Sequence, residues 1–221
     1  GDDLIFSISG GTEIEATLDN NIVFLVPPSN FNGSESFTAT VSDGELSDSQ
    51  SFTVTVTAVN DAPIATIGLS GSTNEDQSVV ISLSASDIDG DNLTFSLDSD
   101  ASNGSVTING TLATYIPDAD FNGSDSFIFS VSDGELSDEA EVVLTVDSVN
   151  DAPILVTLSD IIFNEDENGL VTLSGNDVDG DDLIFSISGG IEIEATLDNN
   201  IVFLVPPSNF NGSESFTAIV S

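Results

Sequence analysis

Acidic side chains recur at fixed intervals along this chain, in short motifs whose spacing suits the binding of a cation. Asp87-Ile-Asp89-Gly-Asp91 places three carboxylates within five residues, and it returns as Asp177-Val-Asp179-Gly-Asp181 ninety positions later. Hard divalent cations such as calcium take about six to eight oxygen ligands, with a preference for carboxylates and carbonyls. The chemistry that these motifs indicate is therefore the coordination of calcium.

The Asp-x-Asp-Gly-Asp motif differs from the loop of an EF-hand. Its glycine is at the fourth position rather than the sixth, and its twelfth position is Asp98 rather than glutamate. The flanking residues show no helical periodicity. A solvated acidic turn without a metal remains the simpler alternative.

The overall charge makes small cations the natural partners of this chain. The 221 residues include 39 acidic ones and no Lys, Arg or His, for a formal net charge of −39 at pH 7. Repulsion between so many negative charges opposes a compact state, and no basic side chain is present to relieve it. We therefore expect a saline, calcium-containing environment outside the cell or at its surface. Nucleic acids and anionic membrane surfaces are excluded as partners because they are polyanions.

Several other classes of site are excluded or made improbable by composition. The chain has no Cys, so it forms no disulfides or thiolate metal sites. Without His, Cys, Lys or Arg it has no imidazole base, thiolate nucleophile or phosphate clamp. Paired carboxylates can cleave glycosides, but here they recur in every unit, as expected of a scaffold, and we expect no enzymatic activity. No apolar run reaches the length of a membrane span, so we expect no direct membrane insertion in this segment.

An internal repeat of about ninety residues organises the whole sequence. Residues 1–42 match 180–221 except that Thr12 becomes Ile191 and Thr40 becomes Ile219. We predict a partial repeat at 1–59 with the last five of seven strands, a complete repeat at 60–149, and a partial repeat at 150–221 with the first six. Near-identity between alternate units indicates recent duplication, so we expect a long array in a larger protein.

Alternation of apolar and polar residues predicts β-strands throughout, and no segment has a helical period. The fold class that we expect is all-β: tandem Ig-like antiparallel β-sandwiches set end to end as a rod. Tyr115 should pack in or beside the core. In the complete repeat the expected strands are 64–70, 78–86, 92–97, 105–109, 111–116, 126–132 and 139–147.

Strand direction determines which acidic loops lie near each other. Because successive strands reverse direction, the loops that hold Glu75 and Asp120 should lie at the C-terminal end of the complete sandwich. The loops that hold Asp87 and Asp133 should lie at its N-terminal end. The repeated linker Asn-Asp-Ala-Pro would then lie between acidic loops of two neighbouring repeats, although an ordinary linker stiffened by proline is the alternative. The predicted metal ligands are Asn60, Asp61, Glu75, Asp87, Asp89, Asp120, Asp133, Asn150, Asp151, Glu165, Asp177 and Asp179.

Taken together, these motifs resemble the cadherin-like tandem repeats of large bacterial RTX-type surface adhesins. The resemblance rests on Asn-Glu-Asp at 74–76, Asp-x-Asp-Gly-Asp, Phe-Asn-Gly-Ser and Asn-Asp-Ala-Pro, all at the ninety-residue period. It implies calcium bound between neighbouring repeats and a secreted rod that projects an adhesive tip from the cell. In the other units Asn30 and Asn209 replace Asp120, which departs from the family pattern, so we expect the sites there to hold fewer ions.

Two other functions stay open at the level of sequence. The incomplete repeats at 1–59 and 150–221 would suit a self-assembling extracellular filament, in which strand exchange between chains completes each sandwich. Direct binding of a sugar, a protein or ice is the third possibility, but the sequence shows no aromatic platform and no flat threonine array. The partners that we expect are the neighbouring repeats through calcium, with self-association into fibres as a possibility.

Overall fold

The computed structural model describes residues 3–221, and every regular element in that range is a β-strand. This confirms the all-β class. The first repeat holds β1 (Ile5–Gly10), β2 (Glu15–Asp19), β3 (Ile22–Val26), β4 (Gly33–Ser42) and β5 (Ser47–Val56). The part of the chain described has no helix long and apolar enough to cross a membrane.

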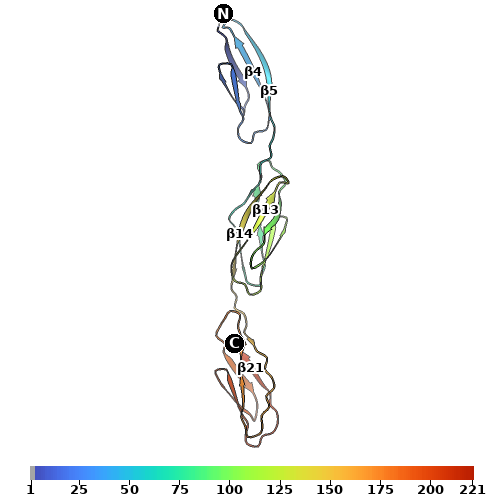
Figure 1. Cartoon of the computed structure of the whole chain (residues 1–221), viewed down its shortest axis with the longest axis vertical. Helices are drawn as coiled ribbons and strands as arrows, with labels where there is room; N and C mark the ends of the chain where they lie inside the picture. The colour runs from blue at the N-terminus through green and yellow to red at the C-terminus, as the bar shows by residue number, and fades with distance from the viewer. Residues whose placement is uncertain (1–2) are drawn as a thin grey trace. The chain divides into compact units, whose positions relative to one another are not determined.

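The middle repeat is a β-sandwich of two antiparallel sheets. Its strands are β6 (Ile64–Ala65), β7 (Leu69–Asn74), β8 (Val79–Ser82), β9 (Ala85–Ser86), β10 (Thr94–Ser99), β11 (Gly104–Asn109), β12 (Leu112–Pro117), β13 (Gly123–Ser132) and β14 (Ser137–Asp147). One sheet has the order β10-β13-β14-β7 and the other the order β11-β12-β8, while β6 pairs with β9. The long neighbours β13 and β14 are labelled in Figure 1.

Two expected strands are interrupted. The segment 64–70 divides into β6 and β7, and 78–86 divides into β8 and β9, so the prediction of continuous strands was wrong there. Gly68 lies between β6 and β7 with a φ of 77°, a conformation that ends a regular strand. The chain thereby changes partners: β6 pairs with β9, whereas β7 joins the sheet that contains β14.

The core of the middle repeat consists of the inward-facing residues of these strands. Tyr115, Phe127 and Phe129 are fully or almost fully buried, and Phe95 packs against Phe129 at 6.1 Å between ring centroids. The burial of Tyr115 confirms the prediction, and its hydroxyl donates to the backbone oxygen of Asn103 at 3.2 Å. Burying side chains of this size contributes about 1.5–3 kcal/mol each.

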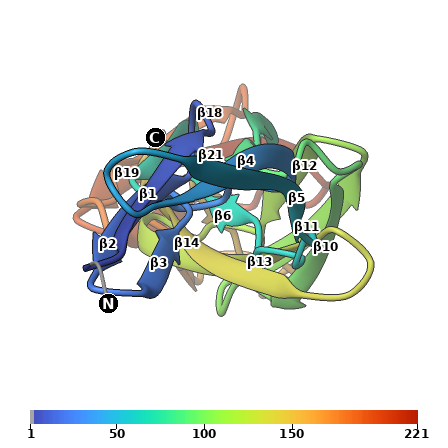
Figure 2. The ribbon, with the colours of Figure 1, turned by 90° about the horizontal axis from the view of Figure 1, so that it is seen from above.

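The first and third repeats have smaller cores. In the first repeat, one sheet has the order β1-β4-β5, labelled in Figure 2, and β2 pairs with β3. In the third repeat, the sheets are β16-β20-β19, β18-β21 and β15-β17. Those strands are β15 (Ile154–Leu155), β16 (Gly169–Thr172), β17 (Gly175–Asn176), β18 (Phe185–Gly189), β19 (Glu194–Asp198), β20 (Ile201–Val205) and β21 (Phe216–Val220).

The chain divides into two compact units, and the boundary runs through the middle repeat. The first unit contains 1–71, 80–115 and 126–143, and the second contains 72–79, 116–125 and 144–221. Each unit therefore contains one Asn-Asp-Ala-Pro linker together with acidic loops that precede or follow it.

Candidate metal centre

In the second unit, the linker residue Asp151 is held against an acidic loop of the third repeat. Its backbone N–H donates to a carboxylate oxygen of Asp179 at 2.7 Å. Asn150 supports the same turn, because its side-chain amide donates to the backbone oxygen of Asp151 at 2.9 Å. Proline at 153 precedes β15 and keeps Ala152 extended. The linker therefore has a defined local conformation beside the Asp-x-Asp motif.

Glu75 enters the same region from the loop between β7 and β8. Its backbone N–H donates to the oxygen of Asp147 at 2.9 Å, and its carboxylate accepts a hydrogen bond from the backbone N–H of Val149. The residue is only 3% exposed. A buried carboxylate is costly unless it is paired, hydrogen-bonded or bound to a metal. In a chain without basic side chains, a metal is the available counter-charge.

Asp120 enters from the loop between β12 and β13. It has a φ of 58°, in the left-handed region that Asn and Asp tolerate better than most residues. Its backbone N–H donates to a carboxylate oxygen of Asp76 at 3.3 Å. The equivalent residues Asn30 and Asn209 both have a φ of 60°. The backbone of this loop thus suits the Asp and Asn residues that occupy this position in the three repeats.

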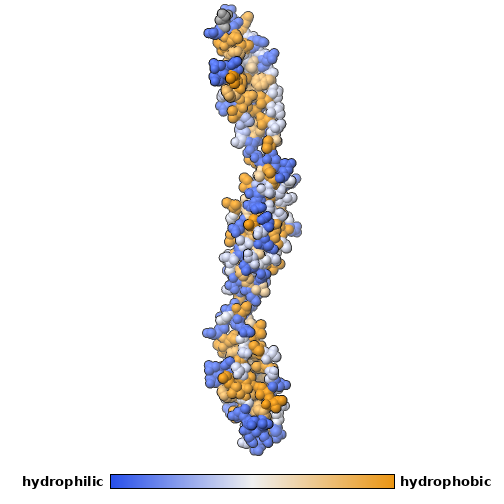
Figure 3. Space-filling model, in the orientation of Figure 1, coloured by the Kyte–Doolittle hydropathy of each residue, from blue (hydrophilic) through white to orange (hydrophobic). Residues whose placement is uncertain are grey.

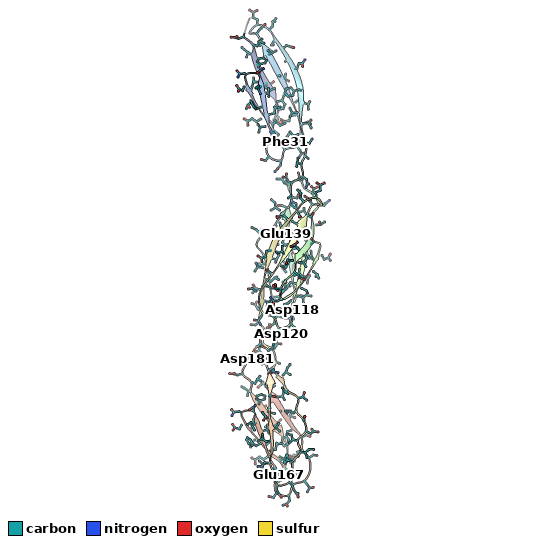
Figure 4. The ribbon with its side chains drawn as sticks, in the orientation of Figure 1. Phe31, Asp118, Asp120, Glu139, Glu167 and Asp181 are labelled. Atoms are coloured by element: carbon teal, nitrogen blue, oxygen red, sulfur yellow. The ribbon has the colours of Figure 1, made fainter. Side chains whose placement is uncertain are left out.

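Two groups of carboxylates meet at Asp151. Oxygens of Glu75, Asp151 and Asp179 lie within 4.8 Å of one another, and so do those of Asp76, Asp120 and Asp151. The cavity beside them has a volume of about 330 Å³ and is lined by Glu75, Asp120, Asn122, Ser148, Val178 and Asp179. Asp118, Asp120 and Asp181 are labelled around this junction in Figure 4.

The electrostatics of Asp151 follow from this crowding. Its pKa is raised above the ordinary value, first by partial desolvation and then by repulsion from the carboxylates of Asp120, Asp179, Asp76 and Glu75. A bound cation reverses this balance, because it favours the ionised form of every ligand. The donor set, all oxygen and strongly anionic, matches the preference of calcium.

In the first unit, the corresponding linker makes the same contact with its Asp-x-Asp motif, but its asparagine has a different partner. The backbone N–H of Asp61 donates to a carboxylate oxygen of Asp89 at 2.8 Å. The side-chain amide of Asn60 donates to Asp133 at 2.9 Å, which ties the linker to the turn between β13 and β14. The hydrogen bonds from the N–H groups of Leu136 and then Glu135, both 2.7 Å, lower the pKa of Asp133, and the bond from Asn60 lowers it further. Asp133 is therefore ionised and oriented by its own turn.

Asp87 supplies a second indication of a metal site. One of its carboxylate oxygens accepts hydrogen bonds from the N–H groups of Asp89, Gly90 and Asp91 at 2.9, 2.9 and 3.2 Å. Its other oxygen is buried and has no hydrogen-bond partner. Oxygens of Asp87, Asp89 and Asp91 also lie within 4.8 Å of one another. A buried, unpartnered carboxylate oxygen inside an acidic loop fits a metal ligand.

The remaining predicted ligands are arranged differently. Asp177 accepts hydrogen bonds from the N–H groups of Asp179 and Asp181 at 3.0 and 3.3 Å, and so shapes its loop as Asp87 does. Glu165 is exposed in the loop between β15 and β16, where Asp166 accepts a bond from Asn209 at 3.0 Å. Sequence reasoning omitted Asp76 and Asp91, although each lies in a motif that it had identified. The ligand set stays a prediction.

Comparison with known proteins agrees with the fold. The family model described as a bacterial Ig domain matches residues 1–57, 60–145 and 150–221. A crystal structure of Drosophila N-cadherin EC1-4 is similar with a TM-score of 0.50 and 14% identity, over 99% of this chain and 65% of that one. These matches confirm the resemblance to Ig-like and cadherin-like repeats.

Two matches are to parts of larger enzymes. Over 140 residues, which are 61% of this chain, the sequence is 34% identical to chitinase A of Pseudoalteromonas piscicida. An endo-fucoidan hydrolase of glycoside hydrolase family 107 is similar with a TM-score of 0.37 and 22% identity, over 98% of this chain. The chain spans 17% of the chitinase and 36% of the hydrolase.

Proposed function

We propose that this chain, which belongs to the bacterial Ig domain family, is a calcium-stiffened spacer segment of a large secreted surface protein. Its repeats project a binding tip away from the cell, and calcium fixes the angle between neighbours. The location that we propose is extracellular, at the cell surface. The segment itself carries no catalytic step in this proposal.

The observation that carries the proposal is the position of Asp151. It belongs to the linker, yet its carboxylate lies among those of Glu75 and Asp120 from the middle repeat and Asp179 from the third. A cation bound here has ligands on both sides of the linker. Neutralising these carboxylates therefore also restrains the segment that joins the two repeats.

The residues that would hold calcium at this linker are Glu75, Asp76, Asp120, Asp151 and Asp179. Calcium supplies positive charge and about six to eight coordination positions, which these oxygens with backbone carbonyls can fill. Val149 and the N–H of Asp151 orient two of the carboxylates before any ion binds. At the first linker, Asp87, Asp89 and Asp91 are the corresponding candidates, with Asp61, Asn60 and Asp133 beside them.

Calcium titration of the chain tests the proposal. We expect calorimetry to show binding, the melting temperature to rise with calcium and fall in EDTA, and small-angle scattering to show a narrower distribution of dimensions with calcium. Magnesium at equal ionic strength is the control, because it demands stricter octahedral geometry and gives up water reluctantly. A chain whose melting and scattering are the same in calcium and in EDTA would contradict the mechanism.

The match to chitinase A favours a second candidate function. In that case the segment would be a spacer inside a secreted polysaccharide hydrolase rather than a surface stalk. The two candidates use the same calcium-dependent stiffness and differ in what the array joins. Sequencing the rest of the gene distinguishes them, since a hydrolase domain on the same chain supports the second and contradicts the first.

A further inference from the structure

The Phe-Asn-Gly-Ser motif occurs at residues 31, 121 and 210, and its asparagine is not among the proposed calcium ligands. In the middle repeat the backbone N–H of Phe121 donates to the oxygen of Asp118 at 3.2 Å, which forms a turn before β13. Gly123 follows with a φ of 132°, and a Cβ at this position would lie 3.7 Å from the ring of Phe121. Residues with a side chain rarely adopt this φ, so the turn itself requires a glycine directly after Asn122.

Asn122 lies at the candidate calcium site. It lines the cavity of about 330 Å³ together with Glu75, Asp120 and Asp179, and hydrophilic residues, drawn in blue, lie at this end of the middle repeat in Figure 3. Asn122 is exposed and directly precedes β13. Unlike the side-chain amide of Asn150, that of Asn122 donates to no other group among residues 3–221. Its amide can therefore turn toward the cavity or toward the backbone of Gly123.

An asparagine followed by glycine is chemically labile, because glycine has no side chain to hinder attack by its backbone nitrogen. That nitrogen attacks the side-chain carbonyl carbon of Asn122 and forms a C–N bond, which closes a succinimide ring. The side-chain amide nitrogen leaves as ammonia and takes up the proton of the glycine N–H. Water then opens the ring at one of its two carbonyls. The products are aspartate or isoaspartate, and the reaction needs no oxidant or reductant.

We propose that Asn122 is a modification site, at which deamidation converts a neutral amide beside the calcium site into a further carboxylate ligand. The effect of the new charge rests on the proposed calcium function, whereas the reaction itself does not. Without calcium, the product adds a negative charge beside Glu75, Asp120 and Asp179, which already line the cavity. With calcium, the added carboxylate strengthens binding, since the charge of the ligands tunes the affinity of oxygen-ligand sites.

Incubation of the full chain in EDTA at mildly alkaline pH tests the reaction. The chain has no Lys or Arg, so a protease that cleaves after acidic residues releases Asn122 in the peptide 121–125. Mass spectrometry of that peptide should show the exchange of the amide for a carboxylate, and an isoaspartate methyltransferase should label part of the product. Asn122→Gln is the control, because its longer side chain closes the corresponding larger ring far more slowly, and conversion at this position should be lost. If Asn122 stays intact in the folded chain while a synthetic peptide of residues 118–126 is converted, the proposal is wrong.

The variant Asn122→Asp measures what the new charge does. In EDTA it should melt at a lower temperature than the parent chain, because a further negative charge joins the acidic group. In calcium it should bind the ion about tenfold more tightly. Asn109→Asp is the matched control, since Asn109 also precedes a glycine but lies outside the cavity. It should fold, because Asp19 and Asp198 occupy the equivalent position in the other repeats, and it should leave both quantities near those of the parent.

The outcomes separate this inference from the proposed function. Equal effects of Asn122→Asp and Asn109→Asp, or an unchanged calcium affinity of Asn122→Asp in a chain that binds calcium, would overturn the ligand role of the product. A parent chain that binds no calcium would instead contradict the proposed function. In that case conversion of Asn122, with a lower melting temperature of Asn122→Asp in EDTA, would still support a modification site beside the carboxylates.

Discussion

The backbone N–H of Asp151 donates to the carboxylate of Asp179 at 2.7 Å, across 28 residues of sequence. The same bond joins Asp61 and Asp89 at 2.8 Å in the preceding linker, again across 28 residues. A contact that returns with the repeat is a property of the linker motif. It holds the second aspartate of each Asp-x-Asp pair beside the linker carboxylate, and three predictions follow from this and the neighbouring contacts.

Replacing Asp179 by Asn should have opposite effects with and without calcium. The amide oxygen still accepts the bond from Asp151, but one negative charge is lost from the group. In EDTA the variant should melt at a higher temperature than the parent chain, because repulsion on Asp151 is reduced. In calcium the variant should bind the ion about tenfold more weakly, which is a loss of about 1.4 kcal/mol of binding free energy. Calcium should therefore stabilise the variant less than it stabilises the parent chain.

Thermal unfolding in EDTA and in calcium, with calorimetric titration, measures both effects. Asp182→Asn is the control for charge alone, since Asp182 is exposed beside the motif and lies outside the two groups. A change of the same sign in EDTA and in calcium would contradict the role of Asp179 as a calcium ligand.

Asp120 allows the backbone and the ligand roles to be separated. Asp120→Asn should fold as the parent does, because Asn30 and Asn209 already occupy this left-handed position with a φ of 60°. Its calcium affinity should nevertheless fall, since one carboxylate is gone. Asp120→Ala should weaken calcium binding and also lower stability in EDTA by about 1–2 kcal/mol, the cost of a left-handed residue without a short polar side chain. Equal stability of the two variants in EDTA would contradict the backbone role.

Substitution of Glu75 should lower the stability of the chain more than substitution of Glu165, its counterpart in the third repeat. Glu75→Ala removes the acceptor for the N–H of Val149 and leaves that group unpaired, at a cost of about 1–3 kcal/mol in the free energy of unfolding. Glu75→Gln keeps the acceptor and should chiefly weaken calcium binding. The matched control is Glu165→Gln, because Glu165 holds the same motif position but is exposed. Denaturant unfolding that is equally affected by changes at residues 75 and 165 would contradict the assignment.

Much of the fold was accessible from sequence because alternating apolar residues and turn signals act locally. The strands around Tyr115, Phe127 and Leu144 lie where the pattern predicts them. The interruption at Gly68 was missed because the change of sheet partner depends on β9 and β14, which lie far away in the chain. A single glycine in an apolar run does not reveal that the strand changes its sheet partner there.

The candidate site was partly predictable for a related reason. Strand direction alone placed Glu75, Asp120, Asp151 and Asp179 in one region, and the structure brings their carboxylates together. Asp76 was missed because its role depends on a left-handed backbone, with a φ of 58°, that turns its side chain toward Asp120.

The first repeat should lose stability in acid through Glu35. This carboxylate accepts bonds from the hydroxyl and N–H of Thr12 and from the N–H groups of Glu13 and Ile14. These bonds, that of the Thr12 side chain first, lower the pKa of Glu35 from 4.5 to about 2. Because the folded state favours the ionised form, the stabilisation is complete above the unfolded value near 4.5. It is lost as the pH falls toward about 2.

Unfolding of the chain in EDTA and constant salt, between about pH 5 and pH 2, measures this loss. In Glu35→Gln the fall in stability across that window should be shallower, whereas the exposed control Glu15→Gln should leave it unchanged. Thr12→Ile should also make the fall shallower, because it removes the hydroxyl that donates to Glu35. The variant reproduces the third repeat, where Ile191 stands at this position and backbone N–H groups alone lower the pKa of Glu214. If Glu35→Gln and the parent chain have parallel pH profiles, the bonds from residues 12–14 do not stabilise the fold.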